Sequence, residues 1–119
     1  MKLLSKAQIK QNRLLPYVQM EKKILSMVKH PFIVGLHYAF QTADKLILVM
    51  TYCPGGDMLE LTKKLKRMDE ERIRRYTAEI ILGLECLHKA EIIYRDLKPA
   101  NVVLDKDGHA CITDFGLAK

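Results

Sequence analysis

Residues 94–101 read Tyr-Arg-Asp-Leu-Lys-Pro-Ala-Asn, and residues 114–116 read Asp-Phe-Gly. Together the two motifs place an Asp, a Lys, an Asn and a second Asp in a fixed order along the chain. For any single Asp among them, a surface position without a function is the better interpretation. The ordered set is much harder to explain in that way, because chance rarely reproduces both motifs at this spacing.

The residues between the two motifs predict a β-hairpin. Runs 102–104 and 110–112 are rich in β-forming residues, and the polar segment between them contains Asp107-Gly108, a dipeptide that favours tight turns. Asn101 precedes the first run and Asp114 follows the second. A hairpin that folds back at the Asp-Gly pair would therefore bring these two side chains to the same end of the ribbon.

These motifs resemble the catalytic loop and the metal-binding turn of protein kinases. Phosphoryl transfer needs little covalent help from a protein, so such an enzyme requires groups that orient the nucleophile and neutralise phosphate charge. The resemblance implies that Asp96 accepts the proton of the substrate hydroxyl and that Lys98 faces the transferring phosphoryl group. It also implies that Asn101 and Asp114 supply oxygen ligands to Mg²⁺.

Further upstream, Lys2 and Glu21 fit the strand lysine and the helix glutamate that hold the ATP phosphates in this family. Pro16 suits the first turn of a helix that extends to about residue 28. A carboxylate on an otherwise apolar helix face requires a cationic partner. On its own, Lys2 would be interpreted as a solvated charge, but the pattern around Glu21 favours the functional role. The apolar residues that share the face of Glu21 are Tyr17, Ile24, Leu25 and Val28.

Two strands, 35–40 and 46–50, are predicted next, and residues 51–58 then read Thr-Tyr-Cys-Pro-Gly-Gly-Asp-Met. This last segment resembles the kinase hinge, whose backbone hydrogen-bonds adenine; a plain Pro-Gly-Gly loop is the alternative. The sequence leaves three roles possible for Asp57: it could cap the next helix, bind the ribose, or bind a basic side chain of the substrate. The residues that the resemblance assigns to the cofactor site here are Met50, Thr51, Tyr52, Cys53, Asp57 and Val103.

Another helix, after the one that Asp57 could cap, is predicted over residues 69–88, with an apolar face that we interpret as core. The basic run at 63–67 could attract nucleic acid or anionic lipid, but a solvated helix end is favoured, and no aromatic residues alternate with its charges. No nucleic-acid partner is therefore expected. The apolar residues of the predicted helix face are Ile73, Tyr76, Ile80, Leu84 and Leu87.

Composition limits the remaining possibilities. The 119 residues are 49% hydrophobic and 29% charged, which indicates one globular unit rather than a disordered or fibrous chain. We expect no transmembrane segment and no secretory signal. The three cysteines lack metal-type spacing and suggest free thiols in a reducing compartment, so a cytoplasmic location is expected; nuclear or membrane-peripheral placement would depend on further domains. The net charge of +6 favours acidic partners without identifying one.

Finer details resemble the AGC group of serine/threonine kinases. Tyr94 stands where most kinases have His, residues 30–34 read His-Pro-Phe-Ile-Val, and Lys98 favours serine/threonine specificity. The resemblance implies ATP and Mg²⁺ as cofactors and a protein hydroxyl as acceptor. With Asp57 after the hinge and Ala100 in the catalytic loop, one upstream basic residue is expected in the substrate. Arg95 resembles the arginine that pairs with an activating phosphate, which implies an upstream activating kinase.

The implied architecture is an α+β, two-lobed kinase fold present only in part. Residues 1–50 would form the end of the N-lobe sheet and its helix, 51–58 the hinge, and 59–119 the first part of the helical C-lobe. Since no glycine-rich loop, activation-segment phosphosite or Ala-Pro-Glu motif occurs, we expect a catalytic-domain fragment with little activity of its own. A gene prediction cut short is the preferred explanation, and a genuine short product is the other. The alternative function is a non-catalytic binding or regulatory fragment.

Overall fold

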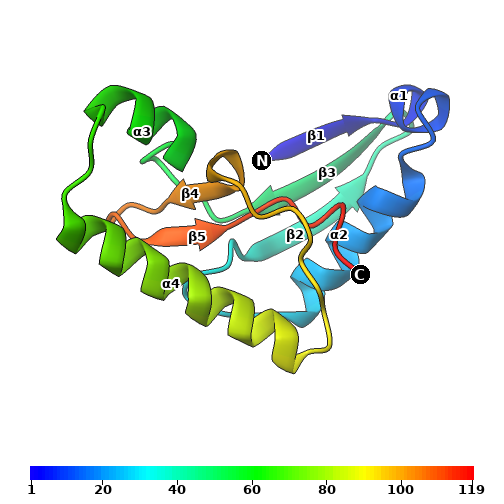
Figure 1. Ribbon diagram of the computed structural model, residues 1–119. Coiled ribbons are helices and arrows are strands. Elements are labelled where there is room, and N and C mark those ends of the chain that lie inside the picture. The colour runs from blue at the N-terminus through cyan, green and yellow to red at the C-terminus, as the bar shows by residue number, and fades with distance from the viewer.

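The computed structural model describes all 119 residues, and its mixture of helices and antiparallel strands confirms the predicted α+β class. A three-stranded sheet and α2 lie on one side of the molecule, and α3 and α4 lie on the other, with the β4–β5 hairpin against α4 (Figure 1). None of the helices has the length and hydropathy needed to span a membrane. In chain order the elements are β1 (Lys2–Ser5), α1 (Lys6–Gln11), α2 (Leu15–Met27), β2 (Leu36–Gln41), β3 (Lys45–Met50), α3 (Met58–Leu65), α4 (Glu70–Lys89), the 3₁₀ turn η1 (Pro99–Asn101), β4 (Val102–Leu104) and β5 (Ala110–Ile112).

The first sheet is antiparallel, with the strand order β1-β3-β2. Lys2 pairs with Leu48 of the central strand, and β2 carries an irregularity between Leu36 and Tyr38. Both strands predicted around the polar turn are confirmed to within a residue. The short helix α1 was not predicted. Its sequence, Lys-Ala-Gln-Ile-Lys-Gln, has one buried residue, Ile9, and so offers almost no apolar periodicity.

Helix α2 begins at Leu15, with Pro16 in its first turn as predicted, and it ends at Met27. Most of the predicted inner face is buried, but Tyr17 is 46% exposed, so its assignment to that face was wrong. This residue lies in the first turn of the helix, near Gly116.

The core joins α2, α4 and the hairpin. Leu87 and Tyr76 of α4 are buried as predicted, whereas Ile73 is 49% exposed and was wrongly assigned to the core. Ile73 lies in the first turn of α4, whereas Arg75 and Tyr76, further along the helix, contact the hairpin. The main cluster consists of Ile24, Leu25, Val28, Ile33, Leu87, Ile92, Tyr94, Ile112, Phe115 and Ala118.

The segment before β2 hydrogen-bonds to β5 and links this core to the first sheet. Val34 N donates to Ile112 O at 3.0 Å, and Ile112 N donates to Phe32 O at 2.9 Å. Ile33 therefore forms a parallel bridge with β5. The division of the chain at residues 50 and 58 stays a prediction.

Candidate active site

Lys2 and Glu21 form an ion pair between β1 and α2. Lys2 Nζ donates to both carboxylate oxygens of Glu21, at 2.8 Å each. Glu21 is only 3% exposed, so the predicted requirement for a cationic partner is met. The same Nζ lies 3.8 Å from Asp114 Oδ1, which brings a third segment of the chain to the pair.

The hairpin forms as predicted and places Asn101 and Asp114 at one end. Its strands pair in the register Val102↔Ile112 to Leu104↔Ala110. Beyond the strands, Thr113 N donates to Asn101 O at 3.0 Å, so the pairing continues as far as the residue before Asp114. Gly108 in the turn has a φ of +81°, a conformation that glycine adopts without strain.

Burial of Phe115 orients the Asp-Phe-Gly turn. The Phe115 side chain is 0% exposed, and its ring lies 5.5 Å from the ring of Tyr94. Asp114 takes a left-handed φ of 63° and keeps a side chain that is 53% exposed. Tyr94 also donates its hydroxyl hydrogen to Thr113 O at 2.6 Å. Burial raises the pKa of Tyr94 far above its ordinary value, so this hydroxyl remains a donor.

The Asp96 carboxylate is held by Lys98 and Asn101. Lys98 Nζ lies 2.9 Å from Asp96 Oδ2, and Asn101 Nδ2 donates to the same oxygen at 2.7 Å. The hydrogen bond from Lys98, supported by the one from Asn101, holds the pKa of Asp96 below its usual value. Asp96 is therefore an ionised acceptor at neutral pH. Because Asn101 uses its nitrogen here, its Oδ1 is left to accept or to ligate.

The oxygen donors of Asn101 and Asp114 fit a Mg²⁺ ion that arrives with a nucleotide. No group of three or more His, Cys, Asp and Glu side chains could hold a metal ion by itself. In proteins, Mg²⁺ commonly takes one or two carboxylates, several waters and the phosphates of a substrate. One carboxylate and one amide oxygen at the end of the hairpin satisfy the protein's share of that arrangement.

The predicted hinge runs beside β4. Thr51 N donates to Gly35 O at 2.9 Å, and further on Gly55 N donates to Leu104 O at 3.0 Å. The return bond, from Leu104 N to Gly56 O, measures 2.9 Å. A Cβ on Gly55 would lie 2.5 Å from Leu104 Cβ, so only glycine allows this close approach. Gly56 has a φ of +73°, a conformation that glycine adopts without strain, so both glycines of the hinge have a structural reason.

The predicted adenine-contacting residues follow one another along this hinge. Met50 packs against the main core, and Thr51 Oγ1 lies 3.1 Å from His37 Nε2, which directs that hydroxyl toward β2. The Tyr52 ring is 82% exposed, whereas Cys53 is partly buried and its thiol has a pKa raised by burial. Their roles toward a cofactor stay predictions.

Asp57 caps α3, which confirms one of its three open roles. Asp57 Oδ1 accepts a hydrogen bond from Glu60 N at 2.8 Å. Its backbone forms an antiparallel bridge with Val103, which is half-buried on β4. The structure thus brings Val103 next to the end of the hinge. Ribose or substrate binding by Asp57 stays a prediction, and the cap leaves Oδ2 for it.

Sequence reasoning missed the contact between Glu79 and His109. Glu79 is 5% exposed on the inner face of α4, and its carboxylate lies 2.7 Å from the His109 ring. The signal was the same one that identified Glu21, a carboxylate among apolar residues at helical spacing.

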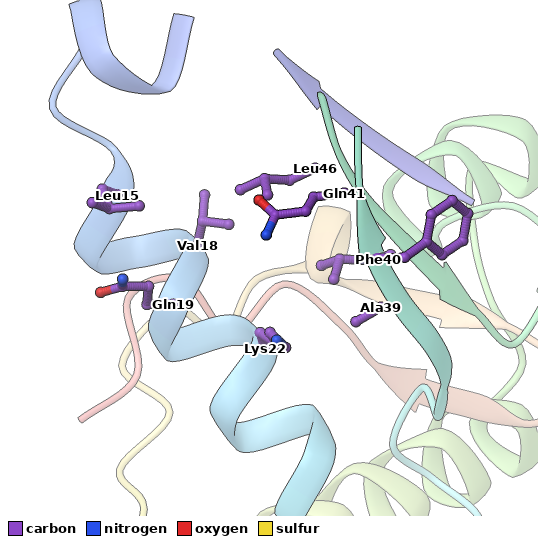
Figure 2. Close-up of a pocket in the computed structure, with 9 residues that line it drawn as sticks. Leu15, Val18, Gln19, Lys22, Ala39, Phe40, Gln41 and Leu46 are labelled. Carbon is purple, nitrogen blue, oxygen red and sulfur yellow. The ribbon is translucent and has the colours of Figure 1, made fainter. Parts of the chain in front are cut away.

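A hollow of about 310 Å³ lies between α2 and strands β2 and β3, away from these residues (Figure 2). Val18 and Lys22 line it from the helix, and Ala39 and Leu46 from the strands. It contains none of the predicted site residues and is separate from the candidate active site.

A family profile for the protein kinase domain matches residues 1–119. The chain belongs to the protein kinase family. Two relatives from Dictyostelium discoideum, "Protein kinase 2" and "RAC family serine/threonine-protein kinase homolog", are 50% and 47% identical to it over 119 residues. Human "Ribosomal protein S6 kinase alpha-1" is 49% identical over 120 residues. These matches confirm the predicted resemblance to AGC-group serine/threonine kinases, and the family generally uses ATP and Mg²⁺.

Each match covers all of this kinase chain but only part of the relative. The chain spans 25% of Protein kinase 2, 27% of the RAC family homolog and 16% of the human S6 kinase. The matches favour a serine/threonine kinase over the non-catalytic alternative.

Proposed function

We propose that this chain forms part of the catalytic domain of a serine/threonine kinase, which transfers the γ-phosphoryl group of ATP to a protein hydroxyl. One observation carries the proposal. The Lys2–Glu21 ion pair reaches Asp114, and Asp114 shares one end of the hairpin with Asn101, which itself binds the Asp96 carboxylate. Charges for the phosphates, oxygens for Mg²⁺ and an acceptor for the hydroxyl proton thus converge from four segments of the chain.

The role proposed for each side chain comes from the resemblance to kinases and is supported by the contacts that the side chain makes. Lys2, held by Glu21, presents its ammonium to the phosphates. Asp96 is ionised and accepts the proton of the substrate hydroxyl, while Lys98 beside it offsets negative charge on the transferring group. A Mg²⁺ ion bound through Asn101 and Asp114 would supply further neutralisation of the phosphate oxygens.

The base of the nucleotide would lie along the hinge. Backbone groups of residues 51–53 are the proposed partners of adenine. Met50 and Val103 are the proposed apolar neighbours of the base, because both are partly buried and lie at the two ends of the hinge.

The protein substrate is proposed to carry a basic residue upstream of its acceptor. Asp57 Oδ2 is the carboxylate oxygen not used by the helix cap, and it is the proposed contact for that residue or for the ribose. Arg95 donates from Nε to Leu117 O at 2.8 Å, and its other nitrogens are the proposed partners of a phosphate added by an activating kinase. A cytoplasmic location completes the proposal.

The test is a calorimetric titration of the chain with ATP, with and without Mg²⁺. Asp114→Ala should remove the gain in affinity that Mg²⁺ provides, whereas Asp107→Ala, an exposed Asp in the turn of the same hairpin, should keep it. Asp96→Asn should leave nucleotide affinity nearly unchanged and lower the turnover of the full-length enzyme about 10²–10⁴-fold, the usual scale of general-base catalysis. An Asp114→Ala variant with an unchanged Mg²⁺ effect would overturn the metal assignment.

A further inference from the structure

Three polar or charged side chains are buried in this chain, and two of them, Glu21 and Asn101, belong to the proposed active site. The third is Glu79, which lies on α4 at the opposite end of the hairpin. Its Oε1 is 2.7 Å from His109 Nδ1, and its Oε2 accepts a hydrogen bond from Ala110 N, also at 2.7 Å. Both oxygens of a buried carboxylate are thus committed to the hairpin.

The hairpin connects this contact to the proposed metal ligands. Ala110 is the first residue of β5 and pairs with Leu104, the last residue of β4. Each strand has only three residues, and after them the chain reaches Asn101 on one side and Thr113 on the other. A group that fixes Ala110 against α4 therefore helps to fix the far end of the ribbon, where Asn101 and Asp114 lie.

The surroundings of His109 decide how this contact responds to pH. From the hairpin itself, Asp105 Oδ1 accepts a hydrogen bond from His109 N at 2.8 Å. From α4, Arg75 reaches Gly108 O, and its charge opposes protonation of the ring. From the segment before β2, the uncharged ring of Phe32 lies 5.9 Å away. The hydrogen bond to Glu79 outweighs burial and raises the pKa of His109 above its ordinary value.

We propose that Glu79 and His109 form a proton-dependent latch that holds the hairpin, and with it Asn101 and Asp114, in position against α4. Glu79 is a positioning residue in this arrangement, since it acts on the site through the hairpin. With the ring protonated, the contact is a charge-assisted hydrogen bond to a carboxylate. With the ring neutral, Nδ1–H can still donate, but the ionic part of the interaction is gone.

The direction of the pH effect follows from the raised pKa. The extra stability is fully present below the pKa of histidine in the unfolded chain, about 6.5. It declines as the pH rises through the higher pKa of His109 in the folded chain. Because 45% of the His109 side chain is exposed, solvent screens the ionic part of the contact, so the folding equilibrium constant should fall only a few-fold, on the scale of a partly exposed ion pair.

The first test uses the 119-residue chain between pH 5.5 and 8.5. Urea unfolding should show this fall in the wild type and not in Glu79→Gln or His109→Gln. The matched controls are Glu85→Gln and His88→Gln, two substitutions on the same helix at residues without contact to the hairpin, and these should keep the wild-type profile. If rising pH lowers the stability of Glu79→Gln as much as that of the wild type, the proposed latch is overturned. If a variant does not fold, the NMR titration of the His109 ring in the wild type decides, because a ring that titrates at its ordinary value also overturns it.

A second readout separates positioning from plain stability, and it rests on the proposed function. The affinity for Mg²⁺-ADP, measured at pH values where each variant is fully folded, should weaken with rising pH in the wild type and in His88→Gln more than in Glu79→Gln. Identical pH profiles would reduce the latch to a stabilising contact and overturn the positioning role. A chain that binds no Mg²⁺-nucleotide at any pH would instead refute the proposed function, and the unfolding profile would still decide the latch.

Discussion

Replacing Lys2 by Met should show how strongly the ion pair with Glu21 holds the first sheet to α2. The pair has two hydrogen bonds of 2.8 Å, and the carboxylate side chain is 4% exposed, whereas the lysine side chain is 33% exposed. A substitution that removes the ammonium leaves a buried carboxylate without its partner. The cost comes from that desolvated group more than from the lost bonds.

The loss in the free energy of unfolding that Lys2→Met causes lies between two known limits. Truncating one partner of a fully buried ion pair costs about 3–5 kcal/mol, and an exposed pair is worth about 0.2–1 kcal/mol. Because one third of the Lys2 side chain contacts water, part of the interaction is screened. We therefore expect Lys2→Met to lower the free energy of unfolding by about 2–3 kcal/mol. The coupling between Lys2 and Glu21 should be about 2 kcal/mol.

The assay is a double-mutant cycle on the 119-residue chain, with Lys2→Met, Glu21→Gln and the double variant unfolded in urea at pH 7. The double variant should be far more stable than the sum of the single effects predicts, since Gln no longer needs a cation. Lys6→Met is the control, because its ammonium contacts only the exposed Thr42 O. A coupling within about 0.5 kcal/mol of zero would place the pair among ordinary surface ion pairs and refute the reasoning.

Two further predictions concern the hinge and its end. Gly55→Ala should destabilise the chain by about 1–3 kcal/mol in urea unfolding, because the new Cβ would lie 2.5 Å from Leu104 Cβ, whereas Gly116→Ala, with its nearest neighbour at 3.6 Å, should cost clearly less; equal losses would contradict this account. Asp57→Ala should cost about 1 kcal/mol, as should Asp69→Ala at the N-cap of α4. In a peptide array of the full-length enzyme, only Asp57→Ala should weaken the preference for an upstream Arg, severalfold to about a hundredfold. An unchanged preference would leave Asp57 as a cap alone.

The features that sequence predicted well depend on short-range signals or on a strict energetic requirement. The hairpin follows from β-forming runs around Asp107-Gly108, and its register then places Asn101 and Asp114 together. The partner of Glu21 follows from the cost of burying an unpaired carboxylate. Both arguments need only residues that are close in sequence, or one residue type that must be neutralised.

The features that were missed depend on where one element ends against another. Periodicity put Tyr17 and Ile73 on apolar faces, but both lie in the first turn of a helix and are about half exposed. Spacing along a helix predicts which residues share a face, and it does not predict how far the neighbouring element extends along that face. Helix α1 was missed for a different reason, since six mostly polar residues carry no periodic signal.

The two buried glutamates, Glu21 and Glu79, lie near opposite ends of the β4–β5 hairpin. Glu21 acts at the Asp114 end of the hairpin through Lys2, and Glu79 acts at the turn end through His109 and the first residue of β5. A ribbon with three residues in each strand has little stability of its own, so its position depends on what holds its two ends. Each end is held by a carboxylate that is itself fixed by burial on a helix. The proposed metal ligands therefore owe their placement to two helices at once, and a change in the charge of either glutamate should be felt at Asn101 and Asp114.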